Sequence, residues 1–407
     1  MSLVCAGYSP RRIETFHFAA LALAATLGAC GSTTGNATAP PVDAGDDSTG
    51  PGDDSGGGGD GGSGGGGSAR PDGGAAGLPG AWQPERGAFG LSDVTAIGGT
   101  AANNVWFADA YGQIFSFDGT SIALEFKDPS LSGWTSICAV RSGDIWFAGD
   151  KGQVSVLQGT SLIPLDPLTS SDVLAVWGTS SRAMWISYFS ITDVPEVAFW
   201  DGSMFHSEAR FNLSAAGSTV TVKSLWGTAI NDVWGAGGKG VWHWNGLTWT
   251  SEEFPIDGGV GLFGVSGTAT DDVWAVGDRS VFHYDGNKWT RVTTPVMATN
   301  TFTAVWAAAR DDVWIVGLDG VILHWNGHQL TRVPSGTTKA LYSVWGTGPL
   351  NVWAGGAENT LLHYQAGNTV PSDPKPACSG AGDSCAMSEC CGALRCYRLN
   401  ASILACG

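Results

Sequence analysis

The sequence is poor in charge, and basic side chains are the scarcer of its charged residues. Only 14% of its 407 residues are charged, and 20 Lys and Arg stand against 37 Asp and Glu, for a formal net charge of −17. Because nucleic-acid binding depends on clustered positive charge, this balance argues against a nucleic-acid partner.

Helical periodicity and familiar catalytic motifs are also missing. The apolar stretch at residues 18–29 is too short to cross a bilayer, and no segment repeats apolar residues at helical spacing. The repeat region has no GxSxG motif, and the sequence has no HExxH or phosphate-loop motif. We therefore predict no catalytic residues, no metal site and no cofactor.

What the chain does contain is a repeat. A Val/Ile/Met-Trp dipeptide occurs seven times at intervals near 40 residues. Its tryptophans are Trp106, Trp146, Trp185, Trp234, Trp274, Trp314 and Trp353. A fixed period of this length indicates a repeat architecture. We expect the repeated tryptophans to pack between neighbouring repeats.

Residues 262–292 show how one repeat is divided. Short runs rich in Val, Trp, Tyr, Phe and Thr alternate with segments containing Gly, Asp and Asn, a pattern typical of antiparallel strands joined by tight turns. Asp285-Gly286 separates the third run from the fourth, and Asp-Gly is a strong hairpin signal because both residues tolerate positive φ. Each repeat thus predicts a four-stranded antiparallel sheet.

The spacing within the repeats is constant. A first-strand position lies eight residues before each repeated tryptophan, at Gly98, Cys138, Trp177, Trp226, Ser266, Trp306 and Trp345. Seven such units predict an all-β fold, a seven-bladed β-propeller over residues 81–366. The last repeat ends after its third strand, at Tyr364, whereas Ala81–Pro84 is similar to fourth strands such as Thr248–Thr250. We therefore expect Ala81–Pro84 to complete the seventh blade.

The VWGT, DVWAVG and HWDG-like units resemble the tryptophan-rich repeats of bacterial surface lipoproteins. The resemblance covers about residues 81–366. It supports the propeller fold and implies little about function.

The N-terminus has the form of an export signal. Arg11 and Arg12 precede the apolar stretch, which ends Leu27-Gly28-Ala29-Cys30. This ending resembles the lipobox of bacterial lipoproteins, which implies a signal peptide at residues 1–29 and lipidation of Cys30. An ordinary signal peptide with a chance cysteine is the alternative. Because Gly31 follows Cys30, we expect by analogy an outer-membrane lipoprotein exposed at the cell surface, with a periplasm-facing protein as the alternative.

A tether is predicted at residues 30–80. Residues 31–80 contain 19 Gly and seven Asp and almost no large apolar side chain, so this stretch cannot bury a core and should be disordered. Such a coil has a root-mean-square span of roughly 40 Å. It would hold the propeller away from the membrane.

The C-terminal segment, residues 378–407, is rich in cysteine. Its six cysteines are Cys378, Cys385, Cys390, Cys391, Cys396 and Cys406. In an exported protein they imply a disulfide framework, whose pairing the sequence leaves open. Their order resembles inhibitor cystine-knot miniproteins (knottins), which implies the pairs Cys378–Cys391, Cys385–Cys396 and Cys390–Cys406. A zinc site formed by these cysteines is the alternative to disulfides. The preceding residues 367–377 contain several prolines and are predicted to form a stiff linker.

Three other features admit a structural and a functional interpretation. His243, His283, His324 and His363 recur at one position of consecutive repeats, which suggests either a ring of metal ligands or, as we favour, a hydrogen bond repeated in each blade. Asp232, Asp272 and Asp312 precede the Val-Trp pair and are expected to cap the preceding turn. Cys138 stands where other repeats have Trp, and we expect a buried free thiol there.

The third repeat is longer than the others at two places, around Ser190–Glu196 and around Asn212–Thr221. In a four-stranded meander both insertions extend the same face of the disc. Loops that depart from the repeat are where repeat proteins usually differ in function, although neutral loop drift is the alternative. The predicted binding residues, all near these insertions, are Tyr188, Phe189, Asp193 and Phe211.

Taken together, these features predict a lipid-anchored, monomeric envelope protein that binds an unknown protein or glycan through a propeller face. The alternative is a carbohydrate-active enzyme of sialidase-like architecture, which would need clustered arginines, a tyrosine nucleophile and an acid. A buried pair of carboxylates with an adjacent tyrosine would favour that enzyme. A third possibility is a structural propeller whose C-terminal module does the binding.

Overall fold

The computed structural model describes most of the residues between 80 and 366 and three short strands near the C-terminus. The described ranges are 80–85, 92–127, 133–140, 142–166, 169–189, 195–210, 221–238, 240–252, 254–255, 261–296, 300–366, 384–385, 396–398 and 404–406. Cys30, the signal peptide and nearly all of the predicted tether lie outside them.

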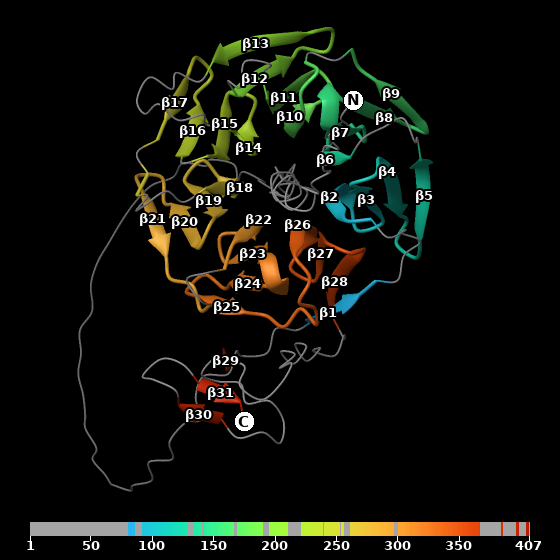
Figure 1. Ribbon diagram of the computed structural model, residues 1–407. Helices are drawn as coiled ribbons and strands as arrows, with labels where there is room; N and C mark the ends of the chain where they lie inside the picture. Colours follow the sequence, from blue (N-terminus) through green and yellow to red (C-terminus); the bar gives the residue numbers. More distant parts are fainter. Residues whose placement is uncertain are drawn as a thin grey trace, which may run out of the picture. The chain divides into compact units, whose positions relative to one another are not determined.

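The described chain from residue 80 to 366 forms a seven-bladed β-propeller (Figure 1). Each blade is a four-stranded antiparallel sheet, as predicted, and its first strand lies innermost in the ring (Figure 1). Blades 1 to 3 contain β2 (Val94–Ala101), β3 (Asn104–Asp109), β4 (Gln113–Phe117), β5 (Ile122–Lys127), β6 (Trp134–Ala139), β7 (Ile145–Gly149), β8 (Val154–Gln158), β9 (Ser161–Pro164), β10 (Val173–Ser180), β11 (Ala183–Phe189), β12 (Pro195–Trp200) and β13 (Phe205–Arg210). Blades 4 and 5 contain β14 (Ser224–Ala229), β15 (Asp232–Gly237), β16 (Gly240–Trp244), β17 (Trp249–Ser251), β18 (Leu262–Ala269), β19 (Asp272–Gly277), β20 (Ser280–Tyr284) and β21 (Trp289–Val292).

Blades 6 and 7 complete the ring. They contain β22 (Phe302–Ala309), β23 (Asp312–Gly317), β24 (Ile322–Trp325), β25 (Leu330–Arg332), β26 (Leu341–Gly348), β27 (Asn351–Gly356), β28 (Thr360–Ala366) and β1 (Gly80–Pro84). Two short 3-10 turns, η1 (Asp150–Gly152) and η2 (Leu318–Gly320), join the second and third strands of blades 2 and 6. No described helix has the length and hydrophobicity needed to cross a membrane.

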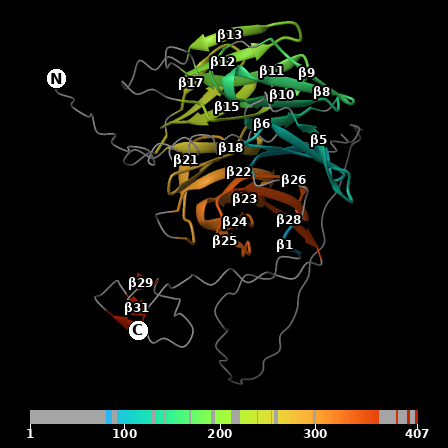
Figure 2. The same ribbon diagram turned by 45° about the vertical axis from the view of Figure 1, so that its right-hand side comes forward.

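The N-terminal strand closes the ring as the sequence predicts. β1 pairs antiparallel with β28, with Trp82 opposite Tyr364, and the two strands lie side by side in Figure 2. Trp82 is fully buried, and its ring lies 5.4 Å from that of Trp314 in blade 6. Trp249 and Trp289 make the same contact with Trp185 and Trp234 of the preceding blades. Trp82 therefore supplies the fourth-strand tryptophan of blade 7.

The first two strands pair in the same register in every blade, as the constant eight-residue spacing allows. Each first-strand position pairs with the repeated tryptophan of its second strand, as in Trp177 with Trp185 and Ser266 with Trp274. The apolar side chains do not form one central core. They form clusters between neighbouring blades; one cluster, for example, joins Trp177 and Trp185 of blade 3 to Leu225 and Trp249 of blade 4. The repeated tryptophans thus pack between blades, as expected.

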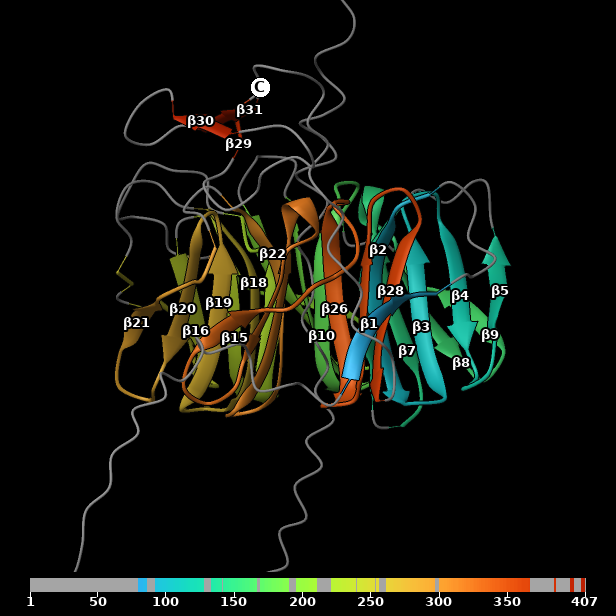
Figure 3. The same ribbon diagram turned by 90° about the horizontal axis from the view of Figure 1, so that it is seen from below.

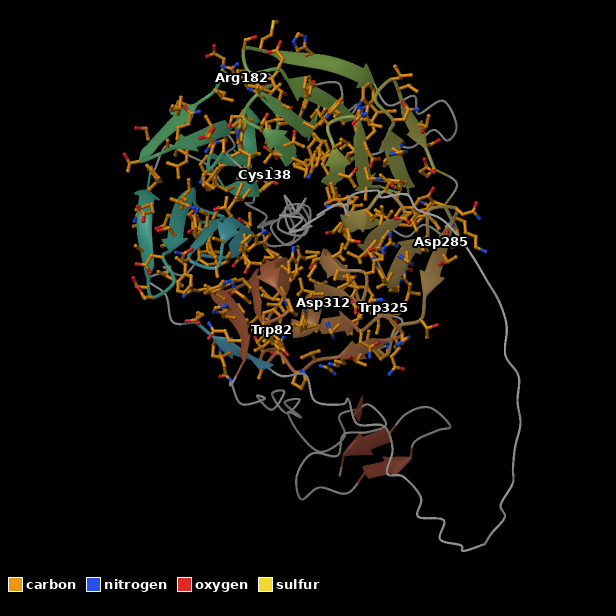
Figure 4. The ribbon with its side chains drawn as sticks, turned by 180° about the vertical axis from the view of Figure 1, so that it is seen from behind. Trp82, Cys138, Arg182, Asp285, Asp312 and Trp325 are labelled. Atoms are coloured by element: carbon orange, nitrogen blue, oxygen red, sulfur yellow. The ribbon has the colours of Figure 1, made fainter. Side chains whose placement is uncertain are left out.

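Cys138 corrects one sequence prediction. It lies in β6, on the inner side of the ring (Figure 4), and is fully buried. The expected free thiol is wrong, because Cys138 is disulfide-bonded. Its Sγ lies 3.9 Å from the carbonyl oxygen of Gly178 in blade 3. The repeat pattern predicts that this position is buried, but a bond to a distant cysteine depends on tertiary structure.

Near the C-terminus, three short strands form a separate antiparallel sheet. They are β29 (Ser384–Cys385), β30 (Cys396–Arg398) and β31 (Leu404–Cys406), and β31 is central. Cys396 lies opposite Cys406 in the register. Cys378, Cys390 and Cys391 lie outside the described residues, so the knottin pairing stays a prediction.

Candidate functional site

The two faces of the propeller are built from different connections. In an antiparallel four-stranded blade, the turn between the second and third strands and the link to the next blade emerge on the same side. We call this side the connection face; it includes the turns at residues 109–113, 149–154, 277–280, 317–322 and 356–360 and the residues just before each inner strand. The opposite side, the hairpin face, carries the other two turns of each blade (Figure 3).

The hairpin face repeats one turn in five blades. The side chain that opens the turn accepts hydrogen bonds from the backbone N–H groups two and three residues later, and the glycine that follows it has positive φ. These residues are Asp118, Asp201, Asn245, Asp285 and Asn326. The hydrogen bond from the backbone N–H of Ser121, followed by hydrogen bonds from Thr120, lowers the pKa of Asp118 to about 2. This face is therefore regular around much of the ring.

The residues predicted to bind at blade 3 do not form one exposed group. Tyr188 is only 4% exposed and belongs to the apolar cluster between blades 2 and 3, so it does not contribute to a surface. Strand alternation is the reason: Tyr188 follows Met184 and Ile186 on the face of β11 that packs toward blade 2. Phe189 is half-buried, at the end of β11. Asp193 and Phe211 lie outside the described residues.

The connection face carries two interacting carboxylates where blades 2 and 3 meet. Oδ2 of Asp150 accepts a hydrogen bond from the backbone N–H of Gly133 at 3.1 Å, and Asp172 accepts one from the N–H of Lys151 at 2.9 Å. Oδ1 of Asp150 is buried and finds no hydrogen-bond partner in the described part of the chain. Burial and then the negative charge of Asp172 raise the pKa of Asp150 to about 6.

Blade 5 has the same aspartate in a satisfied environment. Asp278 accepts the N–H of Gly261 through Oδ2, as Asp150 accepts that of Gly133. Its Oδ1 accepts the hydroxyl of Thr301 at 3.2 Å. The position equivalent to Thr301, directly before the inner strand, is Asp172 in blade 3. One substitution between repeats thus replaces a hydrogen-bond donor with a second carboxylate.

Where blades 4 and 5 meet, the connection face carries a half-buried lysine, Lys223. Lys223 directly precedes β14, and its Nζ lies 4.2 Å from the centroid of the Phe263 ring in blade 5. No ion pair to Lys223 occurs among the described residues. Burial lowers the pKa of Lys223, and the charge of Asp278 opposes this effect.

The ring closure adds a third charged group to the same face. Asp93 of blade 1 accepts the backbone N–H of Glu358 in blade 7 at 2.9 Å, and Lys339 pairs with Glu358 at 2.5 Å. Burial, followed by the charges of Asp93 and Glu358, raises the pKa of Tyr342. The connection face therefore differs in chemistry from one blade boundary to the next.

The repeated histidines form the hydrogen bonds that we favoured over metal ligation. His243, His283 and His324 each lie within 2.6 to 2.8 Å of the aspartate two residues before the Val/Ile/Met-Trp tryptophan of the same blade. His363 contacts Asn351 at 2.6 Å, and burial lowers its pKa to about 3. The rings of His243, His283 and His363 also stack on the repeated tryptophans of their blades, whereas the ring of His324 is tilted against Trp314.

The repeated aspartates tie together the turns that precede them. Thr228 donates its hydroxyl to Asp232, and Thr268 donates to Asp272 in the same way. Among the described residues, no group of three or more His, Cys, Asp or Glu side chains could hold a metal ion.

Comparison with known proteins identifies the fold. No protein-family model matches the chain, and no curated protein matches its sequence. Among solved structures, YCF48 bound to D1 peptide is 12% identical, with a TM-score of 0.55 over 70% of this chain and 95% of that one. Virginiamycin B lyase from Staphylococcus aureus is 12% identical, with a TM-score of 0.58 over 70% and 99%.

A third similar structure is the extracellular domain of the putative one component system BT4673 from B. thetaiotaomicron. It is 13% identical, with a TM-score of 0.58 over 75% of this chain and 42% of that one. At this level of identity the three similarities concern the fold alone. These neighbours are a protein bound to a peptide, a lyase and an extracellular domain, so they leave the activity of this chain open.

Sequence analysis missed the residues that distinguish the connection face. Asp150, Asp172 and Lys223 lie outside the Trp-centred motifs, where the repeats are least alike. A blade-by-blade alignment could have found two of them: Asp172 stands where Thr301 stands in blade 6, and Lys223 where Phe263 stands in blade 5. The burial and the charge interactions at these positions are visible only in three dimensions.

Proposed function

We propose that this protein is a lipid-anchored envelope protein whose propeller binds a protein or glycan partner through the connection face, without catalysis. The observation that carries the proposal is the contrast between the faces. The hairpin face repeats one turn, whereas the connection face holds Lys223, the Asp150–Asp172 pair and the ends of both blade-3 insertions. Irregular loops on a rigid repeat scaffold are a common location for binding sites.

The structural neighbours provide a precedent for binding propellers. One is YCF48 bound to D1 peptide, and another is the extracellular domain of a putative one component system. The lipobox-like ending at Cys30 supports anchoring at the envelope. An acidic chain with few basic residues argues against nucleic acid as the partner.

Site-specific photo-crosslinking in intact source cells tests which face binds. A photoreactive phenylalanine replaces Tyr111, which is 69% exposed on the connection face, or Leu247, which is 88% exposed on the hairpin face. We expect one discrete adduct from position 111 and none from position 247. Adducts from position 247 alone would contradict the proposal.

A loop-shortened variant tests the role of blade 3. Cutting both insertions to the lengths found in blade 5 should abolish the adduct at position 111 while leaving the thermal unfolding transition in place. An adduct that survives this change would remove the insertions from the binding site.

One observation favours the alternative of a glycosidase-like enzyme. Asp150 and Asp172 interact electrostatically, and Asp150 has a raised pKa, as an acid catalyst needs. Tyr188, whose Cα is opposite Val173 in the register, lies beside this pair in the fold, but its side chain is buried. The arginines needed for a sialidase site are separated: Arg279 lies on the connection face and Arg182 and Arg310 on the hairpin face.

Fluorogenic glycosides of neutral, uronic and sialic acid sugars test the enzyme hypothesis. If this pair is catalytic, turnover should fall at least about 100-fold in both Asp150→Asn and Asp172→Asn. Absence of turnover in the unmodified protein across the panel would support the binding function.

A further inference from the structure

The position three residues before the first-strand position of the repeat has the same structural role in three of the blades, and Lys223 departs from it. Thr95, Thr135 and Thr303 occupy this position in blades 1, 2 and 6. Each is at most 5% exposed and donates its hydroxyl to carbonyl groups, one of them in the next blade; Thr95, for example, bonds to Trp134. In blades 4 and 5 the position holds Lys223 and Phe263, which are half-buried.

The ammonium of Lys223 is favourably placed for an anion. Among the described residues, its Nζ lies over the face of the Phe263 ring, and the negative charge of Asp278 interacts with it. Asp278 is already engaged, because its oxygens accept hydrogen bonds from Gly261 and Thr301 at 3.2 Å each. Removing an ammonium from water without an ion pair costs free energy, which an incoming carboxylate would offset.

The surroundings of Phe263 define what else the ligand would contact. A side chain at Gly261 would lie 3.2 Å from Oδ2 of Asp278, 3.7 Å from the carbonyl oxygen of Gly238 and 3.8 Å from the tip of the Phe263 ring. Blades 2, 5 and 6 have Asp150, Asp278 and Leu318 at the turn position of Gly238. The described groups around the ammonium are therefore the Phe263 ring, glycine backbone and the carboxylate of Asp278, whose oxygens already accept hydrogen bonds. The aromatic ring suits apolar carbon atoms better than sugar hydroxyls.

We propose that Lys223 and Phe263 form a binding site for a carboxylate flanked by apolar carbon atoms. Such a group occurs in small aromatic or aliphatic acids and at the C-terminus of a peptide. Lys223 pairs with the carboxylate, and the ring of Phe263 packs against the adjoining carbons. This inference rests on the proposed binding role of the connection face and names the chemistry recognised there.

The test uses phenylacetate as the acid and phenylacetamide as its uncharged counterpart, titrated into the full-length protein by isothermal calorimetry. We expect phenylacetate to bind at least about tenfold more tightly than phenylacetamide, since the two differ in the charge that Lys223 recognises. Lys223→Met, which keeps a linear side chain on Phe263, should weaken phenylacetate binding about tenfold or more, and Lys223→Arg should retain it. Phe263→Leu should weaken it about threefold.

Matched controls separate the site from general effects. Lys288→Met removes an exposed lysine on the hairpin face and should leave binding unchanged. The seven lysines also allow a direct readout: after ¹³C-methylation, one dimethyl-lysine signal should shift with phenylacetate and be absent in Lys223→Met. The peptide acetyl-Ala-Ala-Phe, compared with its C-terminal amide, then distinguishes a peptide source from a free acid.

Equal affinity for acid and amide, or unchanged binding in Lys223→Met, would overturn the site. That result would not by itself refute binding by the connection face, because crosslinking at position 111 reports on the partner independently. Loss of the adduct at position 111 in Lys223→Met, with the fold intact, would support both proposals.

Discussion

Asp312 in blade 6 differs from the equivalent aspartates of blades 4 and 5 in one interaction. Asp232 and Asp272 each accept a threonine hydroxyl through Oδ2, whereas Oδ2 of Asp312 is buried and has no partner in the described chain. The reason is local: blade 6 has Ala308 where blades 4 and 5 have Thr228 and Thr268. A buried acceptor without a donor costs more than the mean value of a hydrogen bond.

Ala308→Thr should therefore stabilise the propeller. We expect the free energy of unfolding to rise by roughly 1 kcal/mol, and Thr268→Ala to lower it by a similar amount. Urea denaturation followed by tryptophan fluorescence measures both. A threonine at position 308 that leaves the urea midpoint unchanged would show that its hydroxyl does not reach Asp312.

Asp150 makes stability depend on pH at the boundary of blades 2 and 3. Its pKa is raised from 3.8 to about 6, so the protonated form favours the fold. That contribution is fully present below pH 3.8 and is lost as the pH rises through 6. Ionised Asp150 then faces Asp172 and weakens the fold at neutral pH.

Asp172→Asn should relieve this repulsion while keeping an acceptor for the N–H of Lys151. We expect the melting temperature to rise by roughly 2 °C at pH 8 and to change little at pH 4. Scanning calorimetry at both pH values checks this, with Asp311→Asn, an exposed change on the hairpin face, as control. An equal gain at both pH values would assign the effect to something other than the ionisation of Asp150.

At the scale of elements, the closing strand matters more than its length suggests. β1 supplies the fourth strand of blade 7 and pairs with the third, so it joins the two ends of the propeller. Trp82 contacts Trp314 and Tyr364, and the hydroxyl of Tyr364 accepts the backbone N–H of Gly80 at 3.1 Å. Without β1, strand β28 would become an open edge.

Trp82→Ala should lower the free energy of unfolding by roughly 3–5 kcal/mol, because it empties a large buried site at the closure. Leu247→Ala, at a side chain that is 88% exposed, is the matched control and should change stability by less than about 0.5 kcal/mol. Urea denaturation measures both. Similar midpoints for the two variants would mean that β1 contributes little to closure.

At the scale of the molecule, we predict that a propeller with two unlike faces is attached to the membrane by a lipid anchor. We predict that a lipid on Cys30 supplies this anchor. Cys30→Ser should move the protein from the detergent phase to the aqueous phase in Triton X-114 partitioning and abolish labelling by radioactive palmitate. Cys5→Ser, within the predicted signal peptide, should preserve both signals. Continued labelling of Cys30→Ser would place the lipid on another residue.

Much of the fold could be predicted because it depends on local patterns. The Trp-centred period specifies the blades, and the constant eight-residue spacing specifies the pairing of the first two strands. The completion of blade 7 by the N-terminal strand could also be predicted, because the sequence around Trp82 resembles that around the fourth-strand tryptophans. In blade 3, strand alternation places Tyr188 on the same buried face of β11 as Met184 and Ile186, so it was not a surface residue.

The sequence by itself determined the class of fold, the number of blades and the strand that closes them, because these follow from residues close together or repeated along the chain. Only the tertiary structure decided which side chains meet across the blade boundaries. The pairing of Asp150 with Asp172, the placement of Lys223 over Phe263 and the disulfide of Cys138 join segments from different repeats or from distant parts of the chain. Their chemistry arises from burial and proximity in space, which periodicity does not encode.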